Sequence, residues 1–237
     1  MEEASAAQLL KGLVDDAGLF PPAALPMHEA LARFRASTSP MLSSRFLCPA
    51  DRVDELASCL DGPIDVHLIG ASEVTLPDDP RITVRAVELR TGIHDGLPCY
   101  LEGIEPAKLK DHGVYGKVRC GGEQIPSVDE LALFVRGAAR HSVPFKATAG
   151  LHAAVRGWES TNGTPHHGYL NLLVAVSRAI SGGNVTQALE STDGNALAEE
   201  ALRLSDDQAV AVRWLFHSYG SCDTQRPVDD AQKLGLL

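Results

Sequence analysis

Basic side chains occur inside segments that otherwise have the composition of buried β-strands. Lys146 lies in "VPFKATAGLH" (143–152), and Lys117 and Arg119 lie in "YGKVRCGG" (115–122). A buried ammonium group is costly unless it is paired with a carboxylate or gives up its proton, and a second cation nearby favours the neutral amine. A neutral lysine amine can attack a carbonyl carbon and form an iminium, which is an electron sink for C–C cleavage, dehydration or proton abstraction.

Carboxylate side chains occupy similar places in two other strand-like segments. Glu88 lies near the end of "RITVRAVELR" (81–90), and Glu102 lies near the end of "PCYLEGI" (98–104). Side chains alternate between the two faces of a strand, so each charged residue shares a face with its neighbours two positions away. Carboxylates beside a lysine amine are suited to moving protons during catalysis. The side chains that alternation assigns to the inner face are Glu88, Arg90, Tyr100, Glu102, Lys117, Arg119, Lys146, Thr148, His217, Tyr219 and Ser221.

Strand-like and helix-like segments alternate along the chain. The clearest helix is 127–142, where Ser127 and Glu130 match a capping box. The segments predicted to be strands are 43–50, 64–70, 81–90, 98–104, 115–122, 143–150, 184–191 and 214–221. Eight βα units in 237 residues predict a single α/β barrel of the (β/α)8 TIM type, irregular at 91–97 where the connection is too short for a full helix. An open doubly wound sheet is disfavoured because no G-x-G-x-x-G motif follows a strand.

The barrel is predicted to span residues 1–237 as one domain, with residues 1–42 forming an N-terminal arm and helix that pack on it. Active sites of such barrels lie at the mouth formed by the carboxyl ends of the strands. The charged side chains expected to converge there are Glu88, Glu102, Lys117, Arg119 and Lys146. A purely structural ion-pair network is the alternative, but ionisable groups held at low dielectric are where proteins tune pKa values for chemistry.

Charge and composition exclude several classes of partner. The chain has 31 acidic and 21 basic residues and a net charge of −10, without a cluster of lysine and arginine, so we expect neither a nucleic-acid nor a membrane partner. No signal peptide is recognised at the start, and no apolar run approaches the ~20 residues of a membrane span. The five cysteines are scattered without zinc-like spacing, which favours a reducing cytoplasm.

Two lysine-containing strands resemble those of a known enzyme family. "PFKATAG" is similar to the Schiff-base strand F-[IV]-K-T-S-T-G of class I deoxyribose-phosphate aldolases, and "GKVRCGG" is similar to that family's V-K-A-[AS]-G-G strand. The resemblance implies an imine on Lys146, a second lysine at Lys117, and a phosphate-binding turn at Gly121 and Gly122. The two strands occur here in the opposite order to that of the aldolases, and no motif matches the aldolases' catalytic aspartate.

The whole chain resembles a family of actinobacterial-type barrel proteins that carry "DDAxLFPP", "KVRCGG", "FKATAGLHH" and "GSCxxxxPVxDLxxLGLL". This resemblance implies no particular activity. The histidine pair of the third motif is reduced here to His152 followed by Ala153.

We therefore expect a lyase or aldolase-like enzyme that acts on a small anionic carbonyl substrate through a lysine in the barrel lumen, as imine-forming amine or general base. The residues expected to be catalytic are Lys146, Lys117, Glu102 and Glu88. The residues expected to bind substrate are Arg119, Gly121, Gly122, Thr148, Arg90, His152 and Ser221. Neither a cofactor nor a bound metal is expected, and a homo-oligomer is left open.

Other assignments stay open at this point. His166 and His167, with His152 and the strand-end glutamates, are the donors of an alternative metal-dependent isomerase or lyase. A barrel that binds a ligand without catalysis is a further alternative. Cys222 is more consistent with a small buried or rim cysteine than with a nucleophile. The carboxylates Asp15 and Asp16 suit either a lid with an acid or base role or a packed arm.

Overall fold

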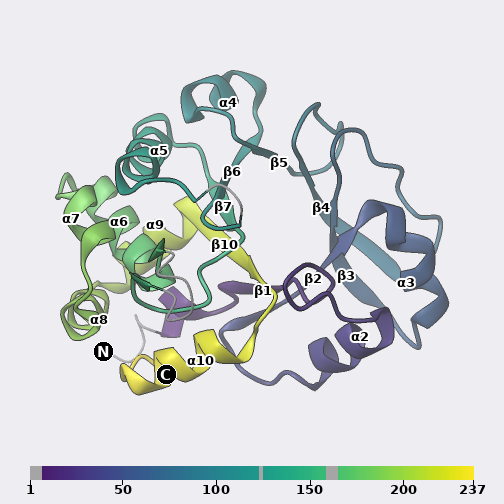
Figure 1. Ribbon diagram of the computed structural model, residues 1–237. Helices are drawn as coiled ribbons and strands as arrows, with labels where there is room; N and C mark the ends of the chain where they lie inside the picture. The colour runs from purple at the N-terminus through teal and green to yellow at the C-terminus, as the bar shows by residue number, and fades with distance from the viewer. Residues whose placement is uncertain (1–6, 123–124, 159–164) are drawn as a thin grey trace.

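The computed structural model describes residues 7–122, 125–158 and 165–237. In this part of the chain eight parallel strands close into a barrel, which confirms the predicted (β/α)8 architecture (Figure 1). The barrel order is β1-β10-β7-β6-β5-β4-β3-β2. The barrel strands are β1 (Val14–Asp16), β2 (Leu42–Pro49), β3 (Ile64–Ile69), β4 (Ile82–Leu89), β5 (Cys99–Glu102), β6 (Tyr115–Arg119), β7 (Phe145–Thr148) and β10 (Phe216–Ser221).

Helices cover the barrel unevenly. The helices whose bounds lie within the described residues are α2 (Met27–Ala36), η1 (Ala50–Arg52), α3 (Val53–Cys59), α4 (Pro106–His112), α5 (Val128–His141), α6 (Tyr169–Ser181), α7 (Val185–Glu190), α8 (Gly194–Leu202), α9 (Asp206–Leu215) and α10 (Gln225–Lys233). Helices α5 to α9 gather on one side of the barrel and α2 and α3 on the other (Figure 1). A small antiparallel pair, β8 (Gly157–Trp158) and β9 (Pro165–His166), follows β7. None of the helices in the described ranges has the length and apolar character needed to cross a bilayer.

One strand assignment from the sequence is wrong and one strand is missed, although the number of barrel strands is right. Residues 184–191 form helix α7 instead of a strand, because the Asn184 side chain caps it by accepting a hydrogen bond from the Gln187 amide at 3.1 Å. The missing strand is β1, which lies within the segment predicted to be an arm packed on the barrel. It is only three residues long, "VDD", and its two carboxylates hide its strand character.

The predicted capping box of α5 is confirmed. The Ser127 hydroxyl accepts a hydrogen bond from the Glu130 amide at 3.2 Å, and the Glu130 carboxylate accepts one from the Ser127 amide at 2.7 Å. This box fixes the first turn of α5, the helix that follows β6 along the chain.

The hydrophobic core lies between the barrel and its helices, outside the lumen. Phe145 of β7 and Phe216 of β10 stack with their ring centroids 5.1 Å apart, in a cluster that includes Leu131 of α5 and Leu173 of α6. A second cluster joins α2 and α3 to β2, β3, β4 and β5. Because the apolar residues of the strands face these helices, the alternate positions that face the lumen are left for polar side chains.

Candidate active site

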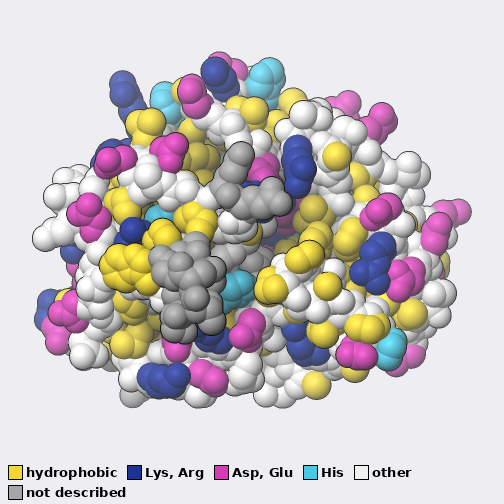
Figure 2. Space-filling view, in the orientation of Figure 1, with side chains coloured by type: hydrophobic (Ala, Val, Ile, Leu, Met, Phe, Trp, Pro, Cys, Tyr) yellow, Lys and Arg dark blue, Asp and Glu magenta, His cyan; other side chains and the backbone are white. Residues whose placement is uncertain are grey.

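A cavity of about 710 Å³ opens at the carboxyl ends of the barrel strands. Strand-end side chains and the loops that follow them both contribute to its wall. The polar and glycine residues that line it include Glu88, Arg90, Glu102, Lys117, Arg119, Gly121, Gly122, Thr148, Gly150, His152, His166 and Arg226. Acidic and basic side chains also meet near the centre of the face that Figure 2 presents. The position matches the place where barrels of this type carry active sites.

Lys146 is fully buried beneath the cavity and is not among the described residues that line it. Its ammonium group lies 2.7 Å from Asp15 Oδ2 and 3.1 Å from His67 Nδ1, and it forms an ion pair with Glu88 Oε1. An ammonium group has three N–H donors, and here they face two carboxylate oxygens and the ring nitrogen of His67. The geometry therefore describes Lys146 as a fully paired cation.

Glu88 links the two lysines of the lumen. Its Oε1 pairs with Lys146, and its Oε2 lies 3.0 Å from the ammonium of Lys117. Burial alone would raise the pKa of Glu88, but the ammonium groups of Lys146 and Lys117 outweigh it and hold that pKa well below its usual range. Glu88 is consequently a fixed negative charge and a weak base.

Lys117 differs from Lys146 because it reaches the cavity. Besides Glu88, it faces Glu102, whose Oε2 lies 3.6 Å from its ammonium nitrogen. Two carboxylate partners for three donors leave one N–H of Lys117 without an acceptor among the described residues. Arg119, two residues further along β6, donates to Glu102 Oε1 at 2.9 Å. Lys117 is thus the lysine whose amine a molecule in the cavity can meet.

The five charged side chains expected to converge are therefore in one network, as the alternation along the strands predicted. They form a chain of neighbours in which cations and carboxylates alternate across β4, β5, β6 and β7. The members of this network are Glu88, Glu102, Lys117, Arg119 and Lys146. Their catalytic roles stay predictions.

Asp15 anchors the lower end of this network and was not assigned to it from the sequence. Its carboxylate is fully buried and accepts hydrogen bonds from Ser43 at 2.5 Å, Arg45 at 2.8 Å and Ser218 at 2.7 Å, besides its ion pair with Lys146. Burial opposes ionisation, but Lys146 and Arg45 outweigh it and lower the pKa of Asp15. Asp15 is therefore a lumen carboxylate of β1.

Its neighbour Asp16 points away from the lumen. The Asp16 carboxylate accepts hydrogen bonds from Arg33 of α2 at 2.5 and 3.2 Å. Alternation along β1 explains why two adjacent carboxylates have such different surroundings. Asp16 thereby ties α2 to the barrel.

Two histidines complete the lumen. His67 of β3 is buried, with Nδ1 3.0 Å from Glu88 Oε1, and burial together with the charge of Lys146 lowers its pKa. His217 of β10 lies 2.7 Å from the Tyr100 hydroxyl, and burial lowers the pKa of His217 to about 4. His67 was missed, although it occupies an inner-face position of the strongly predicted strand "IDVHLIG".

One inner-face assignment in the last strand is wrong. Tyr219 stacks on Tyr169 of α6, with ring centroids 5.8 Å apart, on the helix side of the barrel. The register between β10 and β7 shifts between Phe216 and Ser218, so both His217 and Ser218 face the lumen. Ser221 lies on the same face as Tyr219 and is not among the described residues that line the cavity. Its hydroxyl oxygen lies 2.9 Å from His152 Nδ1.

The other residues expected to bind substrate do line the cavity: Arg90 follows β4, and the rest lie in glycine-rich corners at the ends of β6 and β7. Ala149, Gly150 and Leu151 follow β7 with φ angles of 55°, 70° and 58°, a run of left-handed backbone that costs energy at the two non-glycine positions. A Cβ on Gly121 would lie 2.8 Å from the Gly150 Cα, so only glycine allows the two corners to touch. Turns of this kind present backbone N–H groups and suit an anion.

The rim of the cavity also carries Cys222, whose Sγ lies 3.7 Å from His152 Nε2. Burial raises the pKa of the Cys222 thiol, which keeps it protonated near neutral pH. A protonated thiol is a poor nucleophile, in agreement with the sequence-based interpretation of Cys222 as a rim cysteine.

The metal-binding alternative finds no assembled ligand set in the part of the chain that the structure describes. There, no group of three or more His, Cys, Asp or Glu side chains is arranged to hold an ion. His166 lines the cavity, but His167 is buried, and its Nε2 lies 2.8 Å from the carbonyl oxygen of Pro126. The carboxylates of Glu88 and Glu102 are occupied by basic side chains instead.

Comparison of the chain with family models, with curated proteins and with solved structures finds no match. A barrel fold by itself hosts many chemistries, so function has to be inferred from the site geometry.

Proposed function

We propose that this protein is a lyase of the aldolase type, which acts on a small anionic carbonyl compound at the barrel mouth. The observation that carries the proposal is the pair of lysines on Glu88, of which only Lys117 reaches the cavity. Lys146, beneath it, is enclosed by the carboxylates of Asp15 and Glu88 and the ring of His67. Lys117 is consequently the amine that would condense with substrate, and Lys146 would supply fixed positive charge below it.

Glu102 is the carboxylate best suited to move protons for Lys117. It lies 3.6 Å from the Lys117 ammonium at the edge of the cavity, whereas Glu88 has a strongly lowered pKa and is a poor proton acceptor. Glu102 would take one proton from the ammonium, and the amine would form a C–N bond to the carbonyl carbon. Two of the three ammonium hydrogens would leave with the carbonyl oxygen as water, so Glu102 ends as it began.

The iminium that remains would drive the bond cleavage. Electrons of the bond between the α and β carbons of the substrate would flow into the C=N⁺ group while Glu102 takes the proton of the β-hydroxyl, so the β carbon leaves as the first carbonyl product and an enamine remains, to whose α carbon Glu102 returns that proton. Protonation of the enamine and addition of water would release the second product and restore the Lys117 ammonium. The fixed negative charge of Glu88, 3.0 Å from the Lys117 nitrogen, would stabilise the iminium.

The wall of the cavity supports an anionic substrate. Arg119 and Arg226 both line it, together with the glycine corners at Gly121, Gly122 and Gly150. Guanidinium groups and backbone amides are the usual partners of carboxylates and phosphates. We place the charged group of the substrate on this side and its carbonyl over Lys117.

We also propose that the enzyme acts in the cytoplasm. All five cysteines of the chain are free thiols in the structure. A reducing compartment keeps thiols in this state, which supports the proposal.

Borohydride trapping tests the proposed chemistry. The protein is incubated with a panel of small aldehydes and keto acids and reduced with borohydride, and its intact mass is then measured by mass spectrometry. We expect a stable adduct with the wild type, none with Lys117→Met, and an unchanged adduct with Lys108→Met, whose lysine is exposed on α4. The absence of an adduct across the panel, or an adduct that survives Lys117→Met, would overturn the proposal.

A further inference from the structure

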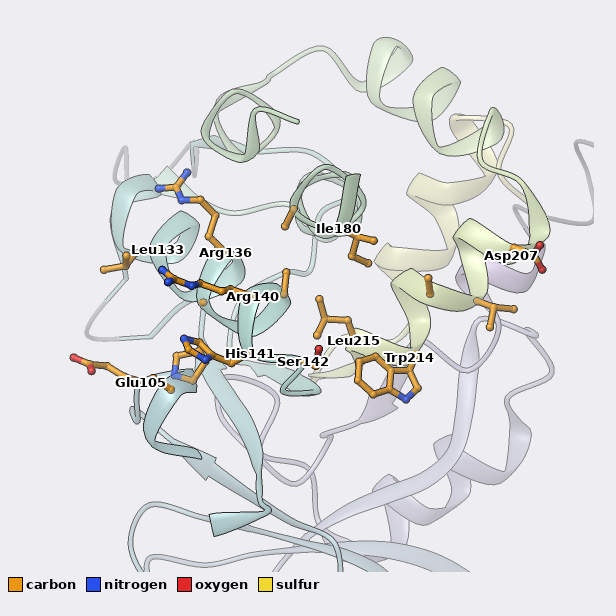
Figure 3. Close-up of a pocket in the computed structure, with 17 residues that line it drawn as sticks. Glu105, Leu133, Arg136, Arg140, His141, Ser142, Ile180, Asp207, Trp214 and Leu215 are labelled. Atoms are coloured by element: carbon orange, nitrogen blue, oxygen red, sulfur yellow. The ribbon is translucent and has the colours of Figure 1, made fainter. Parts of the chain in front are cut away.

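A second depression lies on the outside of the barrel and shares no lining residue with the cavity at the mouth. It is a groove of about 1150 Å³ between helices α4, α5, α6 and α9 (Figure 3). Small-molecule pockets usually measure roughly 300–1,000 Å³, so this groove is at the large end for such a ligand. Its size favours a macromolecular partner.

The groove gathers exposed apolar side chains. Leu133 of α5, Ile180 of α6, and Val210 and Trp214 of α9 line it, and they are four of the eight large apolar side chains that are exposed in the described residues. Trp214 is 54% exposed. Monomeric proteins seldom leave apolar side chains concentrated in this way, and tryptophan is enriched among the residues that dominate binding energy at interfaces.

The two walls of the groove carry opposite charges. Glu105 also lines the groove, on the side of α5, and is paired with Lys108 at 3.5 Å (Figure 3). Arg136 and Arg140 of α5 lie on that same side of the groove, and Asp207 at the start of α9 lies on the far side (Figure 3). Within the described residues none of these three has an ion-pair partner, and Arg136 makes only a 3.3 Å hydrogen bond to the Thr186 hydroxyl. The charges are therefore available to a partner.

We infer that a second copy of this chain packs on this groove about a twofold axis. A twofold contact brings the same surface of both copies together with its two ends exchanged. Arg140 of one copy then faces Asp207 of the other, twice per dimer, while the Trp214 side chains lie in the apolar centre. The opposite charges on the two walls make the groove complementary to itself, and the two ion pairs offset the repulsion between chains of net charge −10.

Sedimentation velocity across a dilution series tests the contact. The wild type is expected to dimerise, and Trp214→Glu to raise the Kd of the dimer by about 30-fold or more, as expected at an interface hot spot. Trp158→Glu is the matched control, because Trp158 is 60% exposed on β8, outside the groove, and its replacement should leave the Kd unchanged. Thermal unfolding of all three proteins checks that they are folded.

A charge exchange tests the twofold arrangement itself. Arg140→Glu and Asp207→Arg should each weaken the dimer, because each places like charges opposite one another. The double variant should restore it, since the two ion pairs re-form with their signs reversed. Arg85→Glu, whose arginine lies on β4 and pairs with Asp65, serves as the control for a change of net charge.

Three results would overturn the inference. The first is a wild type that stays monomeric at concentrations of hundreds of micromolar. The second is a dimer that Trp214→Glu leaves intact, which would place the contact elsewhere. The third is a double charge variant that dimerises no better than the single variants. That result would leave the groove as a site for a different protein or an apolar small molecule.

Discussion

At the scale of single residues, the two lumen lysines have different surroundings despite their similar sequence contexts. Lys146 is enclosed by Asp15, Glu88 and His67, whereas Lys117 has carboxylates on one side and the cavity on the other. A lysine with all its donors satisfied and no exposed surface serves as a charge, and a lysine at a cavity wall can serve as a reagent. Our proposal of separate tasks for the two lysines rests on this difference.

The enclosed position of Lys146 predicts a large loss of stability on its replacement. Lys146→Met leaves the buried carboxylates of Asp15 and Glu88 without their shared cation, which costs about 3–5 kcal/mol in the free energy of unfolding. Lys108→Met, at an exposed pair with Glu105, should stay within about 0.5 kcal/mol of the wild type. Urea unfolding at pH 7 measures both, and a loss below about 1 kcal/mol for Lys146→Met would refute the buried network.

His217 predicts how stability depends on pH. Its pKa is lowered from 6.5 to about 4 in the folded protein, so the unfolded chain binds a proton in this range that the folded chain does not. Stability should therefore fall as the pH decreases from 6.5 to 4, with His217 contributing up to about 3 kcal/mol of the loss. Urea unfolding across this range should show a shallower decline for His217→Asn than for the wild type. An equal slope in the two proteins would contradict a neutral, half-buried His217, and His28→Asn, at an exposed position, should keep the wild-type slope.

At the scale of elements, most of the barrel follows from the sequence because strand alternation and helix caps are local signals. The capping box at Ser127 places α5, and alternation puts Lys117 and Arg119 on one face of β6. Strand β1 is not predicted from the sequence, because a segment of three residues with two carboxylates has too little apolar character to be recognised as a strand. The shift in β10, which turns Tyr219 outward, depends on pairing with β7 and has no local signal.

The contact between the loops after β6 and β7 predicts that Gly121 cannot be replaced. Gly121→Ala would bring a Cβ to 2.8 Å from the Gly150 backbone, so we expect a loss of about 1–3 kcal/mol in the free energy of unfolding and a disturbed cavity wall. Gly62→Ala is the control, because a Cβ there meets nothing within 4 Å. Chemical denaturation of the two variants gives the comparison, and a Gly121→Ala protein as stable as Gly62→Ala would show that the corners can separate.

At the scale of the whole molecule, the structure separates two surfaces for which we propose different tasks. The mouth of the barrel holds the charged cavity, and the groove between α5 and α9 carries exposed apolar side chains and unpaired charges. Asp15 and Ser43 reach the lumen from positions far from Lys146 in sequence, and only closure of the barrel between β1 and β10 brings them together. Long-range closure of this kind is why the lower half of the site could not be predicted from local patterns.

The central claim is that Lys117 is the amine that meets the substrate. It is tested most directly by digesting the borohydride-reduced adduct and locating the modified lysine by tandem mass spectrometry. The account predicts that the modification lies on Lys117, with Lys146 unmodified in the folded protein. A modification on Lys146, or one confined to exposed lysines such as Lys108, would contradict it.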